Sequence, residues 1–135
     1  MPKIIALDFG MKRTGIAATD DLQIIASGLT TVETKKLMEF LKDYFDKNEV
    51  EAIVLGEPKR LDGSDTHISQ AVRDLYKKLT KTFKKPVHYV DERYTSKMAV
   101  QTMIDSGLKK KQRRNKALID EISATLILQS YLESK

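Results

Sequence analysis

The sequence contains no cysteine among its 135 residues, which excludes disulfides, zinc fingers, iron–sulfur clusters and thiol catalysis. It also lacks the run of roughly 18 apolar residues that a membrane helix needs, and its N-terminus lacks the basic and apolar regions of a signal peptide. No internal repeat, low-complexity tract or linker interrupts it. We therefore expect one domain over residues 1–135, located in the cytoplasm and without membrane contact.

Histidine is scarce, and the two histidines, His67 and His88, have no partner at metal-ligand spacing. No histidine lies close in sequence to the serine and threonine candidates for a nucleophile, which argues against a hydrolase triad. Acids and cations are instead plentiful, because charged residues make up 32% of the chain. Any chemistry is therefore expected to rest on carboxylates.

Positive charge is concentrated in the second half of the chain. The 24 basic and 19 acidic residues give a net charge of +5. Residues 1–70 hold 9 basic and 12 acidic side chains, a net of −3, whereas residues 71–135 hold 15 and 7, a net of +8. Six of the eight residues in 109–116 are basic: Lys109, Lys110, Lys111, Arg113, Arg114 and Lys116. Binding of a polyanion such as nucleic acid explains this segment, and a solvated loop or helix end is the alternative.

The hydrophobic pattern predicts an α/β fold in the order βββαβαβαα. The expected strands are 3–9, 15–19, 23–32, 50–55 and 87–90; the expected helices are 34–47, an apolar stripe from 68 to 83, a segment from 95 or 96 to 106, and 117–132. Short connections favour an antiparallel meander of the first three strands, and crossover helices imply that strands one, four and five run parallel. The product is a mixed five-stranded sheet with helices on both faces, whose ligands are expected at the carboxyl ends of its strands.

Acidic residues follow several of these strands. Asp8 ends the first strand, on the same face as Ile4 and Ala6, where a carboxylate is costly unless it is paired, hydrogen-bonded or bound to a cation. Asp91 and Glu92 follow the fifth strand, and Glu57 follows the fourth. Closing a turn at Phe9-Gly10 is the alternative for Asp8, and a surface salt bridge with Arg93 is the alternative for the acids after strand five.

Asp120 interrupts the apolar stripe of the last helix, on the face of Ala124, Ile127 and Tyr131. Interaction with the helix dipole is its alternative role. If the acids from strands one and five and from this helix converge, they form an oxygen-rich site suited to Mg²⁺ or Mn²⁺. Such a cluster activates water for attack on a phosphodiester. Lys12 and Arg13, in the turn after Asp8, add two cations that suit phosphate.

Four blocks of residues, taken in order, resemble the YqgF/RuvX family. They are Ala6–Gly10 with Lys12–Ala17, Gly56-Glu57-Pro58 with Asp62-Gly63-Ser64, Asp91–Ser96, and Lys116 with Ile119-Asp120 and Ala124. That family comprises small bacterial proteins with a ribonuclease H-like fold, described as Holliday-junction resolvases and as nucleases that mature the 5′ end of pre-16S rRNA. The resemblance spans essentially the whole chain.

The resemblance implies catalytic, metal-binding acids at Asp8, Glu92 and Asp120. It further implies that Lys12 and Arg13 meet phosphate, and that Arg93 and Thr95 shape the end of strand five. Glu57 departs from the family, whose members often carry an apolar or basic residue there. Glu57 is therefore an additional metal-ligand candidate, and the choice of second acid among Glu57, Asp91 and Glu92 stays open.

The sequence thus predicts a metal-dependent hydrolase of phosphodiester bonds, acting in pre-16S rRNA maturation and ribosome biogenesis. Two alternatives stay open: a resolvase of branched DNA, and a nucleic-acid-binding module with little catalytic activity. An actin-like ATP-binding domain is disfavoured, because it needs two such domains. The sequence does not distinguish RNA from DNA, a monomer from a homodimer, or one metal ion from two.

Overall fold

A computed structural model describes residues 2–20, 22–58, 67–91 and 116–134. Its strands and helices follow one another in the order that the hydrophobic pattern predicts. They are β1 (Lys3–Phe9), β2 (Arg13–Thr19), β3 (Ala26–Glu33), the 3₁₀ turn η1 (Thr34–Lys36), α1 (Leu37–Lys47), β4 (Val50–Glu57), α2 (Ser69–Phe83), β5 (Val87–Asp91) and α5 (Lys116–Ser134). The helix predicted from residue 95 or 96 to 106 lies outside the described residues.

The five strands form one mixed sheet in the order β3-β2-β1-β4-β5. β1 pairs antiparallel with β2, and β2 pairs antiparallel with β3, so the first three strands form the predicted meander. β4 pairs parallel with both β1 and β5. The predicted parallel set is therefore confirmed, and the ends of β1, β4 and β5 lie along the same edge of the sheet.

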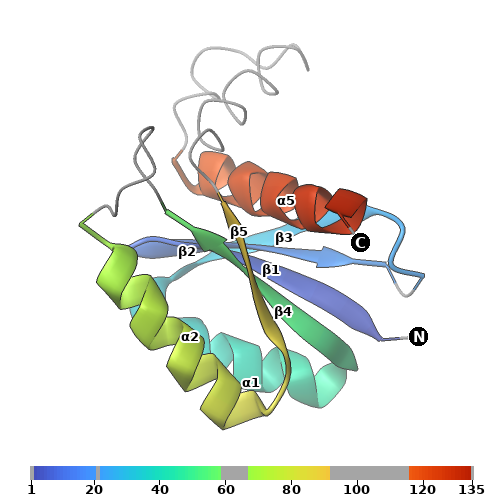
Figure 1. The fold of residues 1–135 in the computed structure, drawn as a ribbon, viewed down its shortest axis with the longest axis horizontal. Coiled ribbons are helices and arrows are strands. Elements are labelled where there is room, and N and C mark those ends of the chain that lie inside the picture. The colour runs from blue at the N-terminus through green and yellow to red at the C-terminus, as the bar shows by residue number, and fades with distance from the viewer. Residues whose placement is uncertain (1, 21, 59–66, 92–115, 135) are drawn as a thin grey trace.

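Helices cover both faces of this sheet, with α1 and α2 on one face and α5 on the other (Figure 1). Alternation along β1 divides its side chains between two cores. Ile5 and Leu7 pack with α1 and α2, while Ile4 and Ala6 pack with Ala124, Ile127 and Leu128 of α5. β1 and β4 are buried on both faces, as expected for the central parallel strands of a layered α/β fold.

Two elements start three residues later than predicted, whereas the other described boundaries agree to within two residues. β3 begins at Ala26 rather than Gln23, because Asp20 accepts hydrogen bonds from the backbone N–H groups of Ile24 (2.8 Å) and Ile25 (3.1 Å). Gln23 also has a positive φ of 58°, so the chain turns there and cannot extend the strand. The predicted helix from residue 34 begins instead as a 3₁₀ turn, and its α-helical part starts at Leu37.

Among the described residues, no helix has the length and apolar character required to cross a membrane. α5 is long enough, at 19 residues, but it carries acids at Asp120, Glu121 and Glu133. Its apolar side instead packs against the sheet.

Candidate active site

Asp8 lies at the carboxyl end of β1, half-buried and one residue before the strand ends. Its neighbours two and four residues earlier, Ala6 and Ile4, belong to the core beneath α5. Alternation therefore directs the Asp8 side chain to the α5 face of the sheet, as predicted from the sequence. Across the antiparallel pair, Asp8 is opposite Gly15 of β2.

Gly15 brings α5 close to Asp8. A Cβ atom built on Gly15 would overlap the backbone carbonyl of Asp120. The N-terminal part of α5 is further tied to the sheet by the Thr31 hydroxyl, which donates to the carbonyl of Ala117 at 2.7 Å. Because Gly15 is the cross-strand partner of Asp8, the backbone of Asp120 lies over the position next to Asp8 in the sheet. Two of the three predicted catalytic acids are thus brought to one place.

Asp120 is not a simple partner of the helix dipole. α5, as described, begins at Lys116, and its first turn contains no acidic residue. Asp120 instead forms an ion pair with Arg13, whose Nε donates to its Oδ2 at 3.2 Å. The two side chains are 38% and 25% exposed, so solvent screens the pair and its contribution to stability is small, on the order of 1 kcal/mol or less. Arg13, predicted to meet phosphate, therefore also holds the Asp120 carboxylate.

The turn between β1 and β2 is fixed by Thr34 of η1. The Thr34 N–H donates to the carbonyl of Lys12 at 3.0 Å, and its hydroxyl donates to the carbonyl of Gly10. The hydroxyls of Thr14 and Thr34 also lie 2.9 Å apart. This bonding sets Lys12 and Arg13 beside η1, around an open pocket of about 380 Å³. The pocket is lined by Met11, Lys12, Arg13, Glu33 and Lys35.

Sequence reasoning missed Lys35. It lies 23 positions after Lys12 in the sequence, and the pairing of Arg13 with Glu33 together with the Thr34 hydrogen bonds places the two cations at one pocket. A pair of lysines in the first turn of the predicted helix 34–47 gave the only signal, and it was indistinguishable from an ordinary solvated helix start.

Glu57 and Asp91 belong to the opposite face. Ile53 and Leu55 of β4 pack with α1 and α2, and Glu57 follows them in the same alternation. Glu57 pairs in register with Asp91 of β5. In contrast to these two acids, Asp8 and Asp120 lie on the α5 side.

The surroundings of the Tyr89 phenol agree with this position of Glu57. Tyr89 stacks on Tyr76 of α2, with ring centroids 4.9 Å apart, so it lies on the α2 face. Burial raises the pKa of Tyr89 above its usual value, and the negative charge of Glu57 raises it further. Glu57 therefore lies near Tyr89, on the α2 face of the sheet.

The remaining predicted site residues lie outside the described part of the chain. They are Glu92, Arg93, Thr95, Lys109, Lys110, Lys111, Arg113 and Arg114; Lys116 begins α5, but its side chain is not described. Within the described residues no group of three His, Asp or Glu side chains is placed to hold a metal ion. Two acids, Asp8 and Asp120, are nevertheless suited to a hard divalent cation through their oxygen donors.

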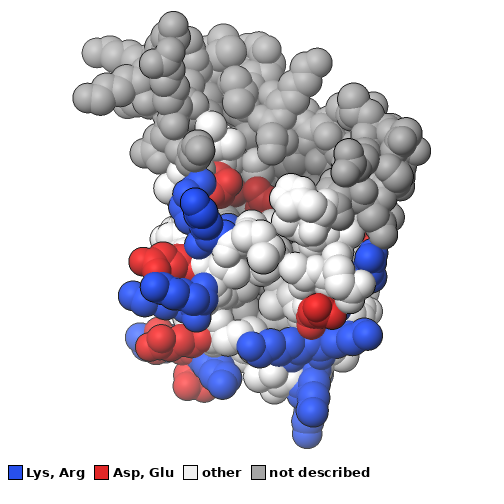
Figure 2. All heavy atoms as spheres, turned by 90° about the vertical axis from the view of Figure 1, so that its left-hand side faces the viewer, with Lys and Arg blue, Asp and Glu red and all other residues white. Residues whose placement is uncertain are grey.

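At the end of the sheet where β1 and β4 finish, the charged side chains of the described residues do not form one large basic patch (Figure 2). Figure 2 faces the end of the sheet where β1 and β4 finish, and there basic and acidic side chains adjoin one another. The predicted basic segment 109–116 falls almost wholly outside the described residues.

A sequence profile of the RuvX family, described as Holliday junction resolvase, matches residues 2–134 of the chain. The chain belongs to the RuvX family. Similar RuvX relatives include proteins of Flavobacterium johnsoniae and Bacteroides thetaiotaomicron, 57% and 52% identical over 136 residues. Each comparison covers 100% of this chain and 99% of the relative, and both relatives carry the name "Putative pre-16S rRNA nuclease". The predicted family and its nuclease class are confirmed.

Solved structures confirm the ribonuclease H-like fold of this RuvX chain. T. thermophilus RuvC, in complex with a Holliday junction substrate, matches with a TM-score of 0.58 at 17% identity, covering 99% of this chain and 96% of that one. The Fowlpox virus resolvase, in complex with Holliday junction DNA, matches with a TM-score of 0.55 at 12% identity, covering 98% and 97%. At these identities the likeness concerns the fold.

Proposed function

We propose that this RuvX protein is a metal-dependent nuclease that hydrolyses phosphodiester bonds in the maturation of the 5′ end of pre-16S rRNA. Relatives more than half identical over their full length carry that nuclease name. The observation that carries the chemistry is the meeting of Asp8 and Asp120 at Gly15, on the α5 face at the carboxyl end of β1. Residues 1–135 act in this proposal as a single nuclease domain.

Asp8, Glu92 and Asp120 are the residues that would hold Mg²⁺ or Mn²⁺. Glu92 is preferred as second acid because Glu57 and Asp91 belong to the other face, whereas Val90, two residues before Glu92, packs in the α5 core. The bound cation would supply an activated water and stabilise charge on the phosphate oxygens.

The protein's own residues would bind and orient the substrate. Lys12, at the turn after Asp8, faces solvent and offers an ammonium group to a backbone phosphate beside the cleaved one. Arg13 keeps the Asp120 carboxylate oriented through its Nε. Arg93, Thr95 and the basic segment 109–116 complete the proposed nucleic-acid contacts, so substrate would extend from the β1–β2 turn across the end of the sheet.

Cleavage assays test this proposal directly. Purified protein is incubated with labelled pre-16S RNA and with a four-way DNA junction, each with Mg²⁺, Mn²⁺ or a chelator. We expect metal-dependent cleavage of the RNA, and a loss of about 100-fold or more in Asp8→Asn protein, since even outer partners of metal sites contribute 10–100-fold. Asp43→Asn makes the same chemical change on the exposed side of α1 and is the matched control.

Each other result identifies an alternative. Preferential cutting of the junction would assign the protein to branched DNA, as the family description indicates for the profile it matches. Salt-sensitive binding without cleavage under any metal condition would assign it to nucleic-acid binding alone. Cleavage that survives in Asp8→Asn protein would locate the activity elsewhere.

A further inference from the structure

The pocket beside the β1–β2 turn combines three cations with a single acid. Lys12 comes from the turn, Arg13 begins β2, and Lys35 comes from η1; among the described residues, Glu33 is the only acid that lines the pocket. Its volume of about 380 Å³ falls within the range of about 300–1,000 Å³ that is typical of small-molecule sites. Met11, 64% exposed, adds an apolar surface to the same wall.

This pocket is built by the fold rather than by chance side-chain positions. Thr34 bonds the turn through the carbonyls of Lys12 and Gly10, and so fixes both walls relative to each other. Within the pocket, Lys35 Nζ lies 3.3 Å from Glu33 Oε2, with the two side chains 78% and 56% exposed. Such an exposed ion pair is weak, so a phosphate can replace Glu33 as the partner of Lys35 at little cost.

We propose that this pocket is a second phosphate subsite, in which Lys12 and Lys35 bind a backbone phosphate of the substrate strand next to the one that is cleaved. The inference rests on the proposed nuclease function and extends it to a new binding residue, Lys35. The strand would pass from Asp8 over the turn to η1, with a sugar or base against Met11. Counterion release from this phosphate would contribute to affinity without reading sequence.

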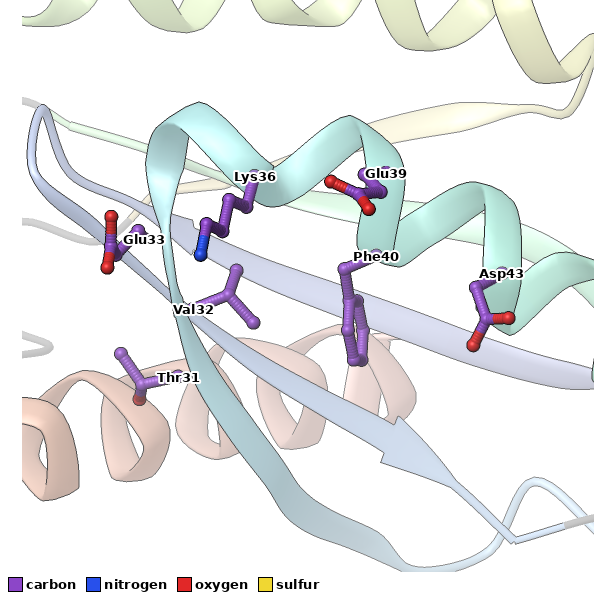
Figure 3. Close-up of a pocket in the computed structure, with 7 residues that line it drawn as sticks. All are labelled: Thr31, Val32, Glu33, Lys36, Glu39, Phe40 and Asp43. Atoms are coloured by element: carbon purple, nitrogen blue, oxygen red, sulfur yellow. The ribbon is translucent and has the colours of Figure 1, made fainter.

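The neighbouring Lys36 gives a contrast within the same turn. It lines a different pocket, of about 860 Å³, together with three acids, Glu33, Glu39 and Asp43. Figure 3 shows Lys36 reaching back toward Val32 of β3 while the acids lie along the end of β3 and the outer side of α1. These acidic surroundings disfavour the binding of a phosphate at Lys36. Lys35 and Lys36 thus carry equal charge but different expected roles.

Binding measurements on Lys35→Ala and Lys36→Ala proteins test the subsite. Both changes are made in Asp8→Asn protein, in which we expect cleavage to be lost, and binding to a labelled single-stranded RNA is followed by fluorescence anisotropy over a salt series. Loss of one phosphate contact should weaken binding about fourfold near 0.15 M salt and lower the slope of log affinity against log salt by about 0.7. Lys36→Ala should change neither quantity. A DNA strand of the same sequence shows whether the subsite distinguishes the two backbones.

Kinetics in protein with Asp8 intact provide the second measurement. Lys35→Ala should raise KM for RNA and leave kcat unchanged, because the lost contact is equal in the ground and transition states. Both lysines are exposed, so unchanged thermal unfolding of the variants is expected and excludes misfolding as the cause.

The outcomes separate this inference from the proposed function. Equal affinities and salt slopes for Lys35→Ala and Lys36→Ala would overturn the subsite, whether or not the protein cuts RNA. Loss of binding in Lys35→Ala alone, in a protein that cuts no substrate, would support the subsite and overturn the nuclease function.

Discussion

Gly15 of β2 lies directly against the backbone of Asp120 in α5, and no side chain fits between them. The contact is between backbone and backbone, so it fixes the distance of α5 from the sheet. Since Gly15 is also the cross-strand partner of Asp8, the same glycine fixes how close the two acids come. The packing of α5 on the sheet therefore also determines the geometry of the candidate metal site.

Gly15→Ala should damage both stability and activity. The added methyl group would overlap the Asp120 carbonyl and would force α5 away from the sheet, at a cost of about 1–3 kcal/mol in unfolding free energy. Displacement of Asp120 should lower cleavage in protein that is still folded. Chemical denaturation and cleavage at a temperature well below the transition measure the two effects.

Gly28→Ala is the matched control for that change. Its methyl group would meet the Glu121 side chain, a flexible group that can move aside, and neither glycine has a left-handed backbone. We expect a smaller loss of stability and unchanged cleavage. Equal losses in the two variants would mean that the close contact at Gly15 has no special role.

Variants of the three candidate acids test which of them is the second metal ligand. Asp91→Asn and Glu57→Gln should cut at rates close to wild type, because β5 and β4 place these residues on the α2 side of the sheet. Glu92→Gln should lose about 100-fold or more, as for other residues of a metal site. Rates of RNA cleavage at saturating Mg²⁺ compare the three variants. A severe loss in Asp91→Asn with full activity in Glu92→Gln would assign the site to the other acid.

Much of the fold was predictable because its elements are defined locally. Alternating and helical patterns placed the strands and helices, and the crossover rule gave the parallel pairs around β1 and β4. The same alternation correctly put Asp8 on the face of Ile4 and Ala6. What these predictions share is that each depends on residues close together in the chain.

The missed features depend on contacts between distant segments. No local pattern shows that Gly15 receives α5, that Arg13 pairs with Asp120 over 107 positions, or that Lys35 joins the turn at Lys12. The start of β3 was missed for a different reason. A single side chain, Asp20, satisfies two backbone N–H groups there and replaces strand pairing with a turn.

Asp20 should make the stability of the protein depend on pH in the acid range. The backbone N–H groups of Ile25 and Ile24 favour the carboxylate and lower the pKa of Asp20 below its usual 3.8. The stabilisation is therefore complete above pH 3.8 and is lost as pH falls through the lowered pKa. Titration of the Asp20 carboxyl by NMR should show the lowered midpoint. A midpoint at or above 3.8 would mean that the turn does not hold the carboxylate in solution.

Arg13 should weaken metal binding in the absence of substrate, because it neutralises one of the carboxylates that the cation needs. An exposed ion pair of this kind is worth about 0.2–1 kcal/mol, so Arg13→Gln should tighten Mn²⁺ binding by about 1.4-fold to fivefold. Cleavage should nevertheless fall, since Arg13 also orients Asp120. Free Mn²⁺ measured by electron paramagnetic resonance gives the affinity independently of activity.

Lys12→Gln distinguishes the effect of the Arg13–Asp120 ion pair on Mn²⁺ affinity from the effect of net charge. It removes an equal charge from the same turn, and no ion pair is found for Lys12 among the described residues. If the two variants change Mn²⁺ affinity equally, the effect is one of net charge, and the Nε–Oδ2 contact at 3.2 Å contributes nothing of its own. A larger change in Arg13→Gln would show that the metal and the guanidinium compete for Asp120. In that case Arg13 lowers the affinity of the site for cations in the absence of substrate.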